Sequence, residues 1–358
     1  MKPYIPDIIT VDERSLDDEI TGNILDKFPD IPYEIIKEGK KPGTQAVYAR
    51  EVTKSKKILN LKYNPGKFIE RCPGTREHLC CNYYVANLAV NCHFECTYCF
   101  LQSYLNDHTI TVYTNIGDFF NEINELPSIN SDRKLRIGTG ELADSLALDE
   151  LTGFSRYLVP FFGNRDDILL ELKTKGDFIN NLLAVDPNDS TVIAWSLNPQ
   201  IIIDKEELKC SSLKERLDSA KECAEYGYKT AFHFDPVILY DGWREDYIDT
   251  IDMLFEHIPA DNIQWISMGV LRFNSAGKTI IRTRFPKTNI IYEEMVKCRD
   301  GKYRYPQPVR TDLYKTLFER IRKYSDDSLY VYLCMESKAV WERVFGNKSN
   351  LIAGIKNF

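Results

Sequence analysis

The sequence has no long hydrophobic run. No stretch of about 18 apolar residues occurs anywhere in its 358 residues, which excludes a membrane-spanning helix. The first residues, Met1 to Asp7, carry no apolar segment behind Lys2 and so do not resemble a signal peptide. We therefore expect a cytoplasmic protein with no membrane partner.

Basic residues are also in deficit, because 46 Lys and Arg stand against 53 Asp and Glu and give a net charge of −7. This balance argues against a protein that coats nucleic acid without specificity, since such binding depends on Lys and Arg displacing counterions from phosphates. A nucleic-acid partner would have to meet a local cluster of cations. Repeats and low-complexity tracts are lacking too, and a composition of 43% hydrophobic and 28% charged residues is that of a globular protein of one large or two ordinary domains.

Cysteines, in contrast, are numerous and unevenly spaced. The chain has ten of them, although a chain of this length buries enough surface to be stable without disulfides. Three of the ten, Cys92, Cys96 and Cys99, lie within eight residues. We expect free or metal-bound thiols.

The pattern of prolines and apolar residues changes near residue 82. Seven prolines punctuate residues 1–75, which we interpret as irregular. Beyond residue 82, apolar runs of strand length alternate with segments whose apolar residues recur every three or four positions. The expected strands are Tyr83–Val90, Lys134–Thr139, Ile168–Thr174, Thr191–Leu197, Lys229–Phe234, Asn262–Val270 and Leu329–Cys334. The expected helices are Ile116–Leu126, Asp149–Leu158, Asp177–Leu183, Ser212–Tyr226, Glu245–His257, Thr311–Tyr324 and Glu336–Gly346. This alternation predicts parallel strands with right-handed crossovers, in a barrel or a doubly wound sheet.

The strongest motif follows the first expected strand. Cys92, Cys96 and Cys99 are separated by three and two residues, so that three thiolates of one loop can bind one metal centre and leave one coordination position open. A [4Fe–4S] cluster held in this way has one iron free for a substrate or cofactor. Two alternatives are a zinc knuckle completed by Cys80, Cys81 or His93, and buried cysteines that bind nothing.

This loop, with an aromatic residue before its last cysteine, resembles that of the radical S-adenosylmethionine superfamily. The run from Cys96 to Leu105, followed by Val112 to Asn115, resembles the spore photoproduct lyase family of DNA repair enzymes, and the likeness covers roughly residues 82–305. It implies an α/β fold with a partial (β/α)6 barrel of the TIM type. An irregular segment (residues 1–81) would precede the barrel (82–275), and a substrate-binding β-hairpin with helices (276–358) would follow it.

The resemblance also implies the chemistry. The cluster would bind S-adenosylmethionine and, after reduction by flavodoxin or ferredoxin, cleave it to a 5′-deoxyadenosyl radical that abstracts a hydrogen atom. The protein is expected to be a monomer. The implied cofactor-binding residues are Tyr98, Gly138, Gly140, Glu141, Asp144, Lys175, Ser196, Asn198 and Asp235, of which Tyr98 and Glu141 are also candidate catalytic residues.

Each of these residues also has an ordinary structural interpretation, such as a tight turn, a helix cap or a core tyrosine. For the loop that contains Gly138, Gly140 and Glu141, the functional interpretation is chemically sensible, because glycines let the backbone approach a ligand and a carboxylate pairs with the methionyl amine. His233 is expected to be a core histidine with its hydrogen bonds satisfied.

The chain departs from the family at two positions. Relatives that act on spore photoproduct are expected to carry a hydrogen-donating cysteine where this chain has Glu141, and a tyrosine where it has Phe100. Neither replacement has a weak S–H or phenolic O–H bond. Another thiol could substitute if the fold brings it close, and the thiols considered are those of Cys210, Cys223, Cys298 and Cys334.

The stretch from Lys278 to Arg310 is unusually basic and has interleaved tyrosines. Such a surface is either a solvated hairpin or a track for phosphates with aromatic side chains beside an extruded base. The expected substrate contacts are Arg272, Arg284, Lys302, Tyr303, Arg304 and Tyr305. The leading hypothesis is a lyase that repairs a thymine photodimer in DNA. The alternatives are a radical enzyme that modifies RNA, a peptide or a small metabolite, as Glu141 and Asp235 suggest, and a non-enzymatic, metal-stapled DNA-binding module.

Overall fold

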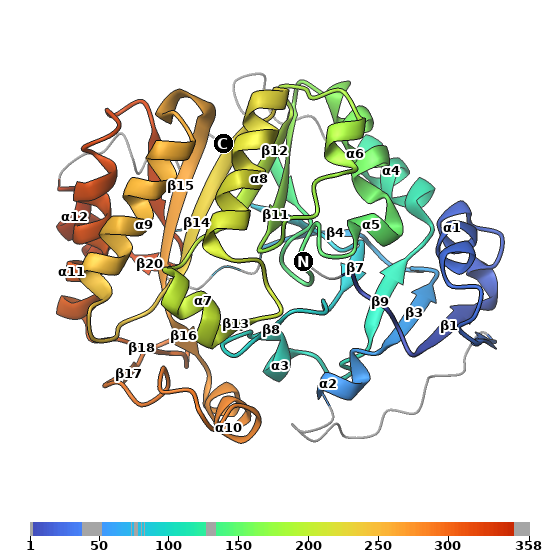
Figure 1. The fold of residues 1–358 in the computed structure, drawn as a ribbon, viewed down its shortest axis with the longest axis horizontal. Helices are drawn as coiled ribbons and strands as arrows, with labels where there is room; N and C mark the ends of the chain where they lie inside the picture. The colour runs from blue at the N-terminus through green and yellow to red at the C-terminus, as the bar shows by residue number, and fades with distance from the viewer. Residues whose placement is uncertain are drawn as a thin grey trace.

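The main sheet of the computed structural model curls into an open half-barrel (Figure 1). The model describes residues 3–37, 52–72, 74, 78–79, 81, 83–126 and 134–346. The eight strands are ordered β19-β15-β14-β12-β11-β10-β6-β4, and all neighbours are parallel except β4 and β6. Their bounds are β4 (Ile69–Arg71), β6 (Tyr84–Ala86), β10 (Leu135–Gly138), β11 (Ile168–Thr174), β12 (Thr191–Ser196), β14 (Lys229–Val237), β15 (Ile263–Val270) and β19 (Tyr330–Leu333). The prediction of an α/β partial barrel is confirmed.

A second sheet lies beside the half-barrel, at the blue end of the chain in Figure 1. Its order is β2-β1-β3-β9-β7, with only β7 antiparallel to its neighbour. The bounds are β1 (Ile8–Asp12), β2 (Tyr33–Ile36), β3 (Ile58–Lys62), β7 (Ala89–Val90) and β9 (Ile110–Tyr113). The segment that we expected to be irregular is therefore more regular than its prolines suggest, because Pro29 and Pro32 fall between helix α1 and strand β2 rather than within them. It also supplies β4 to the barrel sheet, and the domain boundaries at residues 81 and 275 stay a prediction.

Helices cover the outer face of the half-barrel, and the last of them lie at the side opposite the second sheet (Figure 1). Their bounds are α1 (Glu19–Lys27), α2 (Val52–Ser55), α3 (Leu101–Tyr104), α4 (Ile116–Glu125), α5 (Asp149–Thr152), α6 (Phe154–Gly163), α7 (Gln200–Glu206), α8 (Leu213–Tyr226), α9 (Trp243–His257), α10 (Ser275–Arg284), α11 (Gln307–Ile321) and α12 (Lys338–Phe345). None of the helices in the described ranges is long and apolar enough to cross a membrane.

Three small sheets complete the fold. Strand β8 (Glu95–Cys96) pairs with β13 (Glu207–Leu208), and β5 (His78–Leu79) pairs with β20 (Glu336–Ser337). Strand β18 (Tyr303–Arg304) pairs with both β16 (Arg272–Phe273) and β17 (Val296–Lys297). The expected hairpin is therefore real only around β17 and β18, because the basic residues at its start form helix α10 instead.

Three expected elements differ from the structure for local reasons. The first strand divides into β6 and β7, which join different sheets, since alternation of apolar residues does not reveal the pairing partner. The helix from Asp149 is broken at Gly153, whose φ of +65° is left-handed. The segment Asp177–Leu183 contains only the start of a short 3-10 turn, Leu182–Ala184, because a segment this short rarely nucleates an α-helix. Helix α8 matches its prediction, with the capping box of Ser212 and Glu215 at its start.

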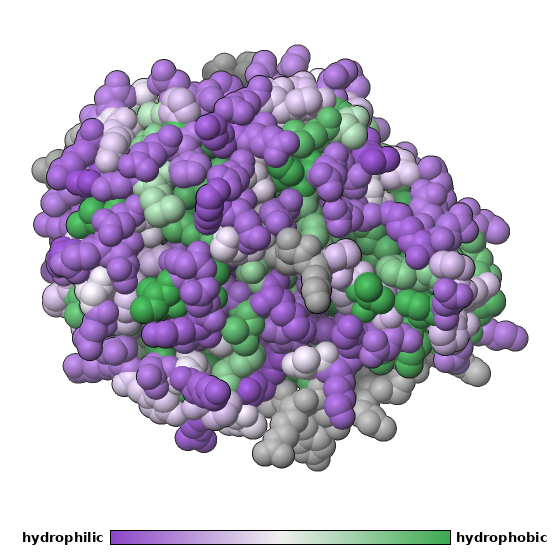
Figure 2. All heavy atoms as spheres, viewed as in Figure 1, coloured by the Kyte–Doolittle hydropathy of each residue, from purple (hydrophilic) through white to green (hydrophobic). Residues whose placement is uncertain are grey.

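The strands of the half-barrel are apolar on their outer face, where Leu170, Ile193, Phe232 and Ile266 are fully buried under the helices. On the inner face, charged and polar side chains alternate with them. Hydrophilic residues cover most of the face seen in Figure 2, with apolar residues in separated patches between them. The inner face of the half-barrel therefore holds the polar groups that need an explanation.

Candidate active site

The three clustered cysteines lie on the loop between β7 and α3. Burial raises the pKa of Cys92 to about 12, and the negative charges of Asp144, Cys99 and Cys96 contribute. Burial also raises the pKa of Cys99, and the negative charge of Cys96 raises it further. The charges of the three thiols therefore interact pairwise. Cys92 and Cys96 pack against the buried side chains of Phe94, Ala147 and Phe178.

Three cysteine thiols are a donor set that a [4Fe–4S] cluster can use. Within the described ranges, no three His, Cys, Asp or Glu side chains are grouped closely enough to hold one metal ion. His93, a possible zinc ligand, is wedged among the rings of Tyr4, Phe94 and Phe178, and burial lowers its pKa to about 4. Of the other two possible zinc ligands, Cys81 lies near Arg136 inside the barrel, where its charge raises the pKa of the guanidinium. Cys80 lies outside the described residues.

A charged network crosses the inner face below the cysteine loop. Glu171 of β11 accepts hydrogen bonds from Arg136 Nη2 at 2.8 Å and contacts His233 Nε2 at 2.7 Å. The other nitrogen of His233 lies 2.6 Å from Ser267 Oγ, and Arg136 also donates to Tyr332 Oη at 2.9 Å. Burial opposes ionisation of Glu171, but Arg136 and His233 outweigh it and hold the pKa of Glu171 well below its usual value. His233 is thus the satisfied core histidine that the sequence predicts.

One layer closer to the cysteines lies the mouth of the half-barrel. Side chains two residues apart on a strand share a face, so Gly138, Lys173, Asp235, Gly269 and Cys334 follow the network residues towards the carboxyl ends of their strands. The two glycines have no room for side chains. A Cβ at Gly138 would lie 1.8 Å from Tyr83 Oη, and one at Gly269 would lie 2.7 Å from the carboxyl carbon of Asp235.

The glycine-rich loop after β10 uses its carboxylate within the protein. Glu141 Oε1 lies 2.9 Å from Nζ of Lys173. Burial opposes the charged form of Lys173, but Glu141 and Glu171 outweigh it and raise its pKa. A Cβ at Gly140 would lie 3.0 Å from Cβ of Lys173, so this glycine accommodates the lysine. The structure brings Gly138, Gly140 and Glu141 to the mouth, as the sequence predicts, and adds Lys173 as their unpredicted partner.

A second cluster of buried charges stands beside the cysteines. Tyr98 donates its phenolic hydrogen to Glu207, which also accepts a hydrogen bond of 2.8 Å from Asn198 and pairs with Arg216 at 2.5 Å. Burial and Glu207 raise the pKa of Tyr98 well above its usual value. The ammonium of Lys175 lies 5.8 Å from the centroid of the Tyr98 ring. Tyr98 and Lys175 thus lie together near Cys96, and their role towards the cofactor stays a prediction.

Two predicted cofactor residues, Asn198 and Asp144, have hydrogen-bond partners within the protein, and their role towards a cofactor stays a prediction. The Asn198 amide is hydrogen-bonded at both ends, since its nitrogen donates to Glu207 and its oxygen accepts a 2.7 Å hydrogen bond from Tyr247. Asn198 therefore positions Glu207. Asp144 accepts hydrogen bonds from the backbone of Leu146, Ala147 and Lys175 and from the hydroxyl of Thr174; it therefore holds the end of β11. Ser196 is buried on the inner face, where its backbone oxygen accepts from Arg216.

Several predicted substrate contacts are paired within the protein, and their role towards a substrate stays a prediction. Arg272 forms a two-pronged ion pair with Asp235, at 2.9 and 3.1 Å. Arg304 is 1% exposed and binds Asp300. Tyr305 is fully buried, and its oxygen accepts from Leu239 N. Tyr303, the neighbour of Arg304 in β18, is half-buried and stacks on Phe273.

Arg284 is also turned inward. Its guanidinium pairs with Glu95 at 2.6 Å and donates to Gln102 and to Thr53. Glu95 lies between two of the clustered cysteines. Arg284 therefore ties α10 to the cysteine loop and does not face solvent. Lys302 keeps a partly exposed ammonium, whose pKa is lowered by burial and by the charge of Arg272.

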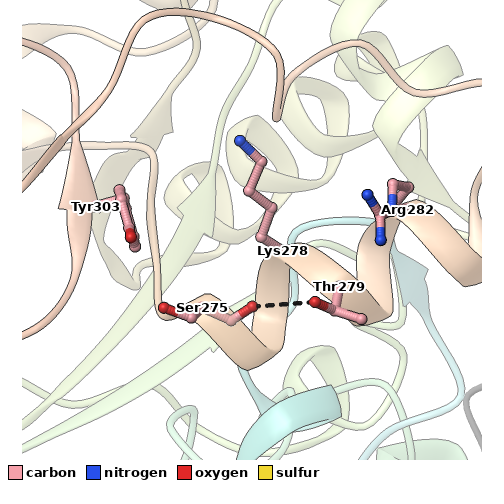
Figure 3. Close-up of a pocket in the computed structure, with 5 residues that line it drawn as sticks. All are labelled: Ser275, Lys278, Thr279, Arg282 and Tyr303. Atoms are coloured by element: carbon pink, nitrogen blue, oxygen red, sulfur yellow. Dashed lines mark hydrogen bonds between the residues drawn. The ribbon is translucent and has the colours of Figure 1, made fainter.

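The exposed cations of the basic stretch gather on helix α10. Figure 3 shows Lys278 extending from the helix between Tyr303 and Arg282, with Ser275 and Thr279 along the near side. These five residues line a hollow of about 200 Å³. Helix α10 packs against α3, where the rings of Phe100 and Tyr104 are 51% and 64% exposed. Exposed cations and hydroxyls therefore lie on α10, and exposed rings lie at α3, the helix that α10 contacts.

Sequence patterns missed the buried charges of the inner face. Glu171, Arg136, Lys173 and Glu207 lie inside runs that look like ordinary strands or a loop, and only their charge within an apolar strand hinted at an inward orientation. Of the four thiols considered as hydrogen donors, only Cys334 lies at the mouth. Burial raises the pKa of Cys334 to about 12, and the charges of Asp235, Arg272 and Glu141 also affect it. Cys223 lies on the buried face of α8, Cys298 lies beside β17, and Cys210 Sγ lies 3.6 Å from Cys96 Sγ.

Known proteins resemble this chain over almost its whole length. The family model for spore photoproduct lyase matches residues 4–334. The spore photoproduct lyase of Geobacillus sp. (strain Y412MC61) is 24% identical over 339 residues, which cover 90% of this chain and 97% of the relative. That of Bacillus subtilis (strain 168) is 24% identical over 311 residues, 84% and 89% of the two chains.

Solved structures show the same fold. A spore photoproduct lyase with a cysteine replaced by alanine, in complex with dinucleoside spore photoproduct, aligns with a TM-score of 0.80 and 23% identity over 94% of this chain and 100% of its own. A double mutant with bound AdoMet and the same dinucleoside aligns with a TM-score of 0.79, at the same identity and coverage. Because the family model spans nearly all of the sequence, the chain belongs to the spore photoproduct lyase family.

Proposed function

We propose that this chain is a radical S-adenosylmethionine lyase that repairs spore photoproduct, a thymine photodimer, in DNA. The observation that carries the proposal is the loop of Cys92, Cys96 and Cys99 at the mouth of a half-barrel whose sequence matches the lyase family. These cysteines would hold a [4Fe–4S] cluster with one open iron. When bound there, the cluster supplies the electron that cleaves S-adenosylmethionine into methionine and a 5′-deoxyadenosyl radical.

The protein's own residues provide the surroundings for this chemistry. The buried phenol of Tyr98, the ammonium of Lys175 and the carboxylate of Glu207 form a fixed polar wall beside the cysteines. Glu141 offers a carboxylate to the methionyl amine, in competition with the ammonium of Lys173. Below the mouth, the buried ion pair of Arg136 and Glu171 forms a fixed polar floor.

DNA would contact the surface of α10 and α3. Lys278 and Arg282 are one helical turn apart, so both ammonium and guanidinium face the same phosphate run. The exposed rings of Phe100 and Tyr104 provide stacking surfaces for bases displaced from the helix. Asp235 and Glu141, which suggested a different polar substrate, are neutralised by Arg272 and Lys173, and so they no longer favour that alternative.

We also propose that Cys334 donates the hydrogen atom that Glu141 cannot supply. The product radical would take the hydrogen of the Cys334 S–H bond and become a closed-shell thymine, which leaves a thiyl radical. That radical would in turn take a hydrogen atom from 5′-deoxyadenosine, so that atoms and electrons balance. The geometry that supports this role is the register of β19, which places Cys334 on the same face as Tyr332 and nearer to the cysteine loop.

The test is repair of an oligonucleotide that contains spore photoproduct by anaerobically reconstituted protein with dithionite and S-adenosylmethionine. We expect intact thymines from the wild type and none from Cys96→Ala. Cofactor cleavage without repair of the lesion would refute the substrate, and zinc without iron or sulfide would refute the enzyme in favour of the metal-stapled module. Flavodoxin or ferredoxin as electron donor, the monomeric state and a cytoplasmic location stay predictions.

The donor thiol is tested separately with Cys334→Ala. We expect lesion consumption to continue while intact thymine falls at least several-fold and side products rise, because the product radical loses its hydrogen source. Cys298→Ala, which removes a thiol beside β17, should leave the product ratio unchanged. An unchanged ratio in Cys334→Ala would exclude Cys334 as the donor without affecting the rest of the proposal.

A further inference from the structure

A fourth thiol stands against the cysteine loop. Cys210 Sγ lies 3.6 Å from Cys96 Sγ, within the range of a hydrogen bond between sulfur atoms. The next acceptor around Cys210 is the backbone oxygen of Leu208, at 3.9 Å. Together with Cys92 and Cys96, Cys210 packs against the apolar cluster of Phe94, Ala147 and Phe178. The contact between Cys210 and Cys96 is therefore partly buried.

The chain is built so that Cys210 folds back over Cys96. Antiparallel pairing of β13 with β8 sets Glu207 opposite Cys96. Lys209 then adopts a left-handed φ of +62°, and the Cys210 N–H donates to Glu207 O at 3.1 Å. Ser211 N–H closes the turn on Lys175 O, also at 3.1 Å. A non-glycine residue in this conformation persists only where the surrounding pairing holds it, so the position of Cys210 is fixed.

We propose that Cys210 is a positioning residue that donates its S–H hydrogen bond to the thiolate of Cys96 and so raises the reduction potential of the cluster. This inference rests on the proposed function, since it requires Cys96 to be a cluster ligand. A ligating Cys96 has lost its hydrogen, and Cys210 is then the only one of the two that can donate.

The physical effect follows from charge. Reduction adds one negative charge to the cluster and its thiolates, and a hydrogen bond to a ligand sulfur stabilises the reduced form more than the oxidised form. Groups that surround the ligands are known to orient them and to tune the metal. Because the contact is partly buried, the interaction is stronger than it would be at a fully exposed surface. Cys210 should therefore ease the electron transfer that starts the reaction.

The test is a redox titration of the reconstituted full-length protein, monitored by the EPR signal of the reduced cluster. In Cys210→Ala, we expect the equilibrium constant for reduction to fall by several-fold and up to about tenfold, which corresponds to about 59 mV for one electron. In Cys210→Ser, the hydroxyl still donates, and the potential should stay near that of the wild type. Cys223→Ala removes a thiol on the buried face of α8, away from the cysteine loop, and should not shift the potential.

A second measurement compares the wild type with Cys210→Ala by a different method. ENDOR spectra of the reduced cluster in H2O and D2O should reveal one exchangeable proton coupled to the cluster, and this signal should be missing in Cys210→Ala. Equal potentials in the wild type and Cys210→Ala, or no such proton, would overturn the inference. A changed iron environment in Cys210→Ala before S-adenosylmethionine is added would also overturn it, because Cys210 would then be a ligand. If no variant holds iron and sulfide, the proposed function itself fails.

Discussion

The buried network of Glu171, Arg136 and His233 offers a quantitative test of how the half-barrel is held together. Glu171→Gln keeps the shape of the side chain but removes its charge. The guanidinium of Arg136 would lose its carboxylate partner at 2.8 Å while its side chain stays 2% exposed. Breaking one partner out of a buried ion pair costs about 3–5 kcal/mol, because the other charge stays buried without compensation.

Part of that cost is offset by what Arg136 keeps. It still donates to Tyr332 Oη, and its guanidinium lies 4.1 Å from the centroid of the Trp265 ring, an arrangement worth about 1–2 kcal/mol when water is excluded. We therefore expect Glu171→Gln to lower the free energy of unfolding by about 3 kcal/mol, at the lower end of that range. The exposed Glu222→Gln on α8 should change it by less than about 0.5 kcal/mol.

The assay is urea unfolding of the cluster-free protein, followed by circular dichroism, with a double-mutant cycle. Arg136→Met should also destabilise, because it leaves Glu171 without its cation. The double mutant Glu171→Gln with Arg136→Met removes both charges, and we expect it to be less destabilised than the sum of the two single changes by about 1–3 kcal/mol. Additive single effects, or a cost below about 1 kcal/mol for Glu171→Gln, would show that the network does not carry the energy that its burial implies.

Three further predictions concern different parts of the molecule. Gly138→Ala should destabilise the protein by about 1–3 kcal/mol in thermal melts, because the added Cβ would collide with Tyr83 Oη. The control Gly22→Ala, in open space on α1, should stabilise the protein by about 0.5–1 kcal/mol. Equal effects of the two substitutions would contradict the collision. Since the folded-state pKa of Glu171 lies below its ordinary value of 4.5, its contribution to stability is complete above about pH 4.5 and is lost as the pH falls further. Unfolding midpoints in Glu171→Gln should therefore depend less on pH below 4.5 than in the wild type, and parallel curves would contradict this. Lys278→Ala and Arg282→Ala should each reduce the slope of the logarithm of the DNA affinity against the logarithm of salt concentration by about one phosphate contact, measured by fluorescence anisotropy. The control Lys323→Ala, beyond the end of α11, should not change this slope. Unchanged slopes in Lys278→Ala and Arg282→Ala would remove α10 from the DNA-binding surface.

Periodicity and spacing predicted the strands of the half-barrel well, because each strand is a short apolar run whose neighbours along the chain are helices. They also singled out the three-cysteine loop, because its cysteines lie close together in the sequence. What they could not predict was the pairing of charges between strands. Lys173 with Glu141 and Arg272 with Asp235 are partners that only the register of the sheet brings together.

The basic stretch shows the same limit. In the sequence, Lys278, Arg284 and Arg304 look equivalent, since each is a cation in a polar segment. In the structure, Arg284 and Arg304 are buried against Glu95 and Asp300, and only Lys278 is exposed. Exposure depends on which acidic residue of another segment lies within reach, and the sequence alone does not contain that distance.

The inward guanidinium of Arg284 has a consequence for how this protein could be re-engineered. It is the last residue of α10, and it binds Glu95 within the cysteine loop and Gln102 just after it. The helix proposed to hold the DNA and the loop proposed to hold the cluster are thus one mechanical unit. A graft of α10 from a relative with another substrate would need Glu95 and Gln102 to travel with it, so substrate choice and radical generation are not exchangeable as separate modules.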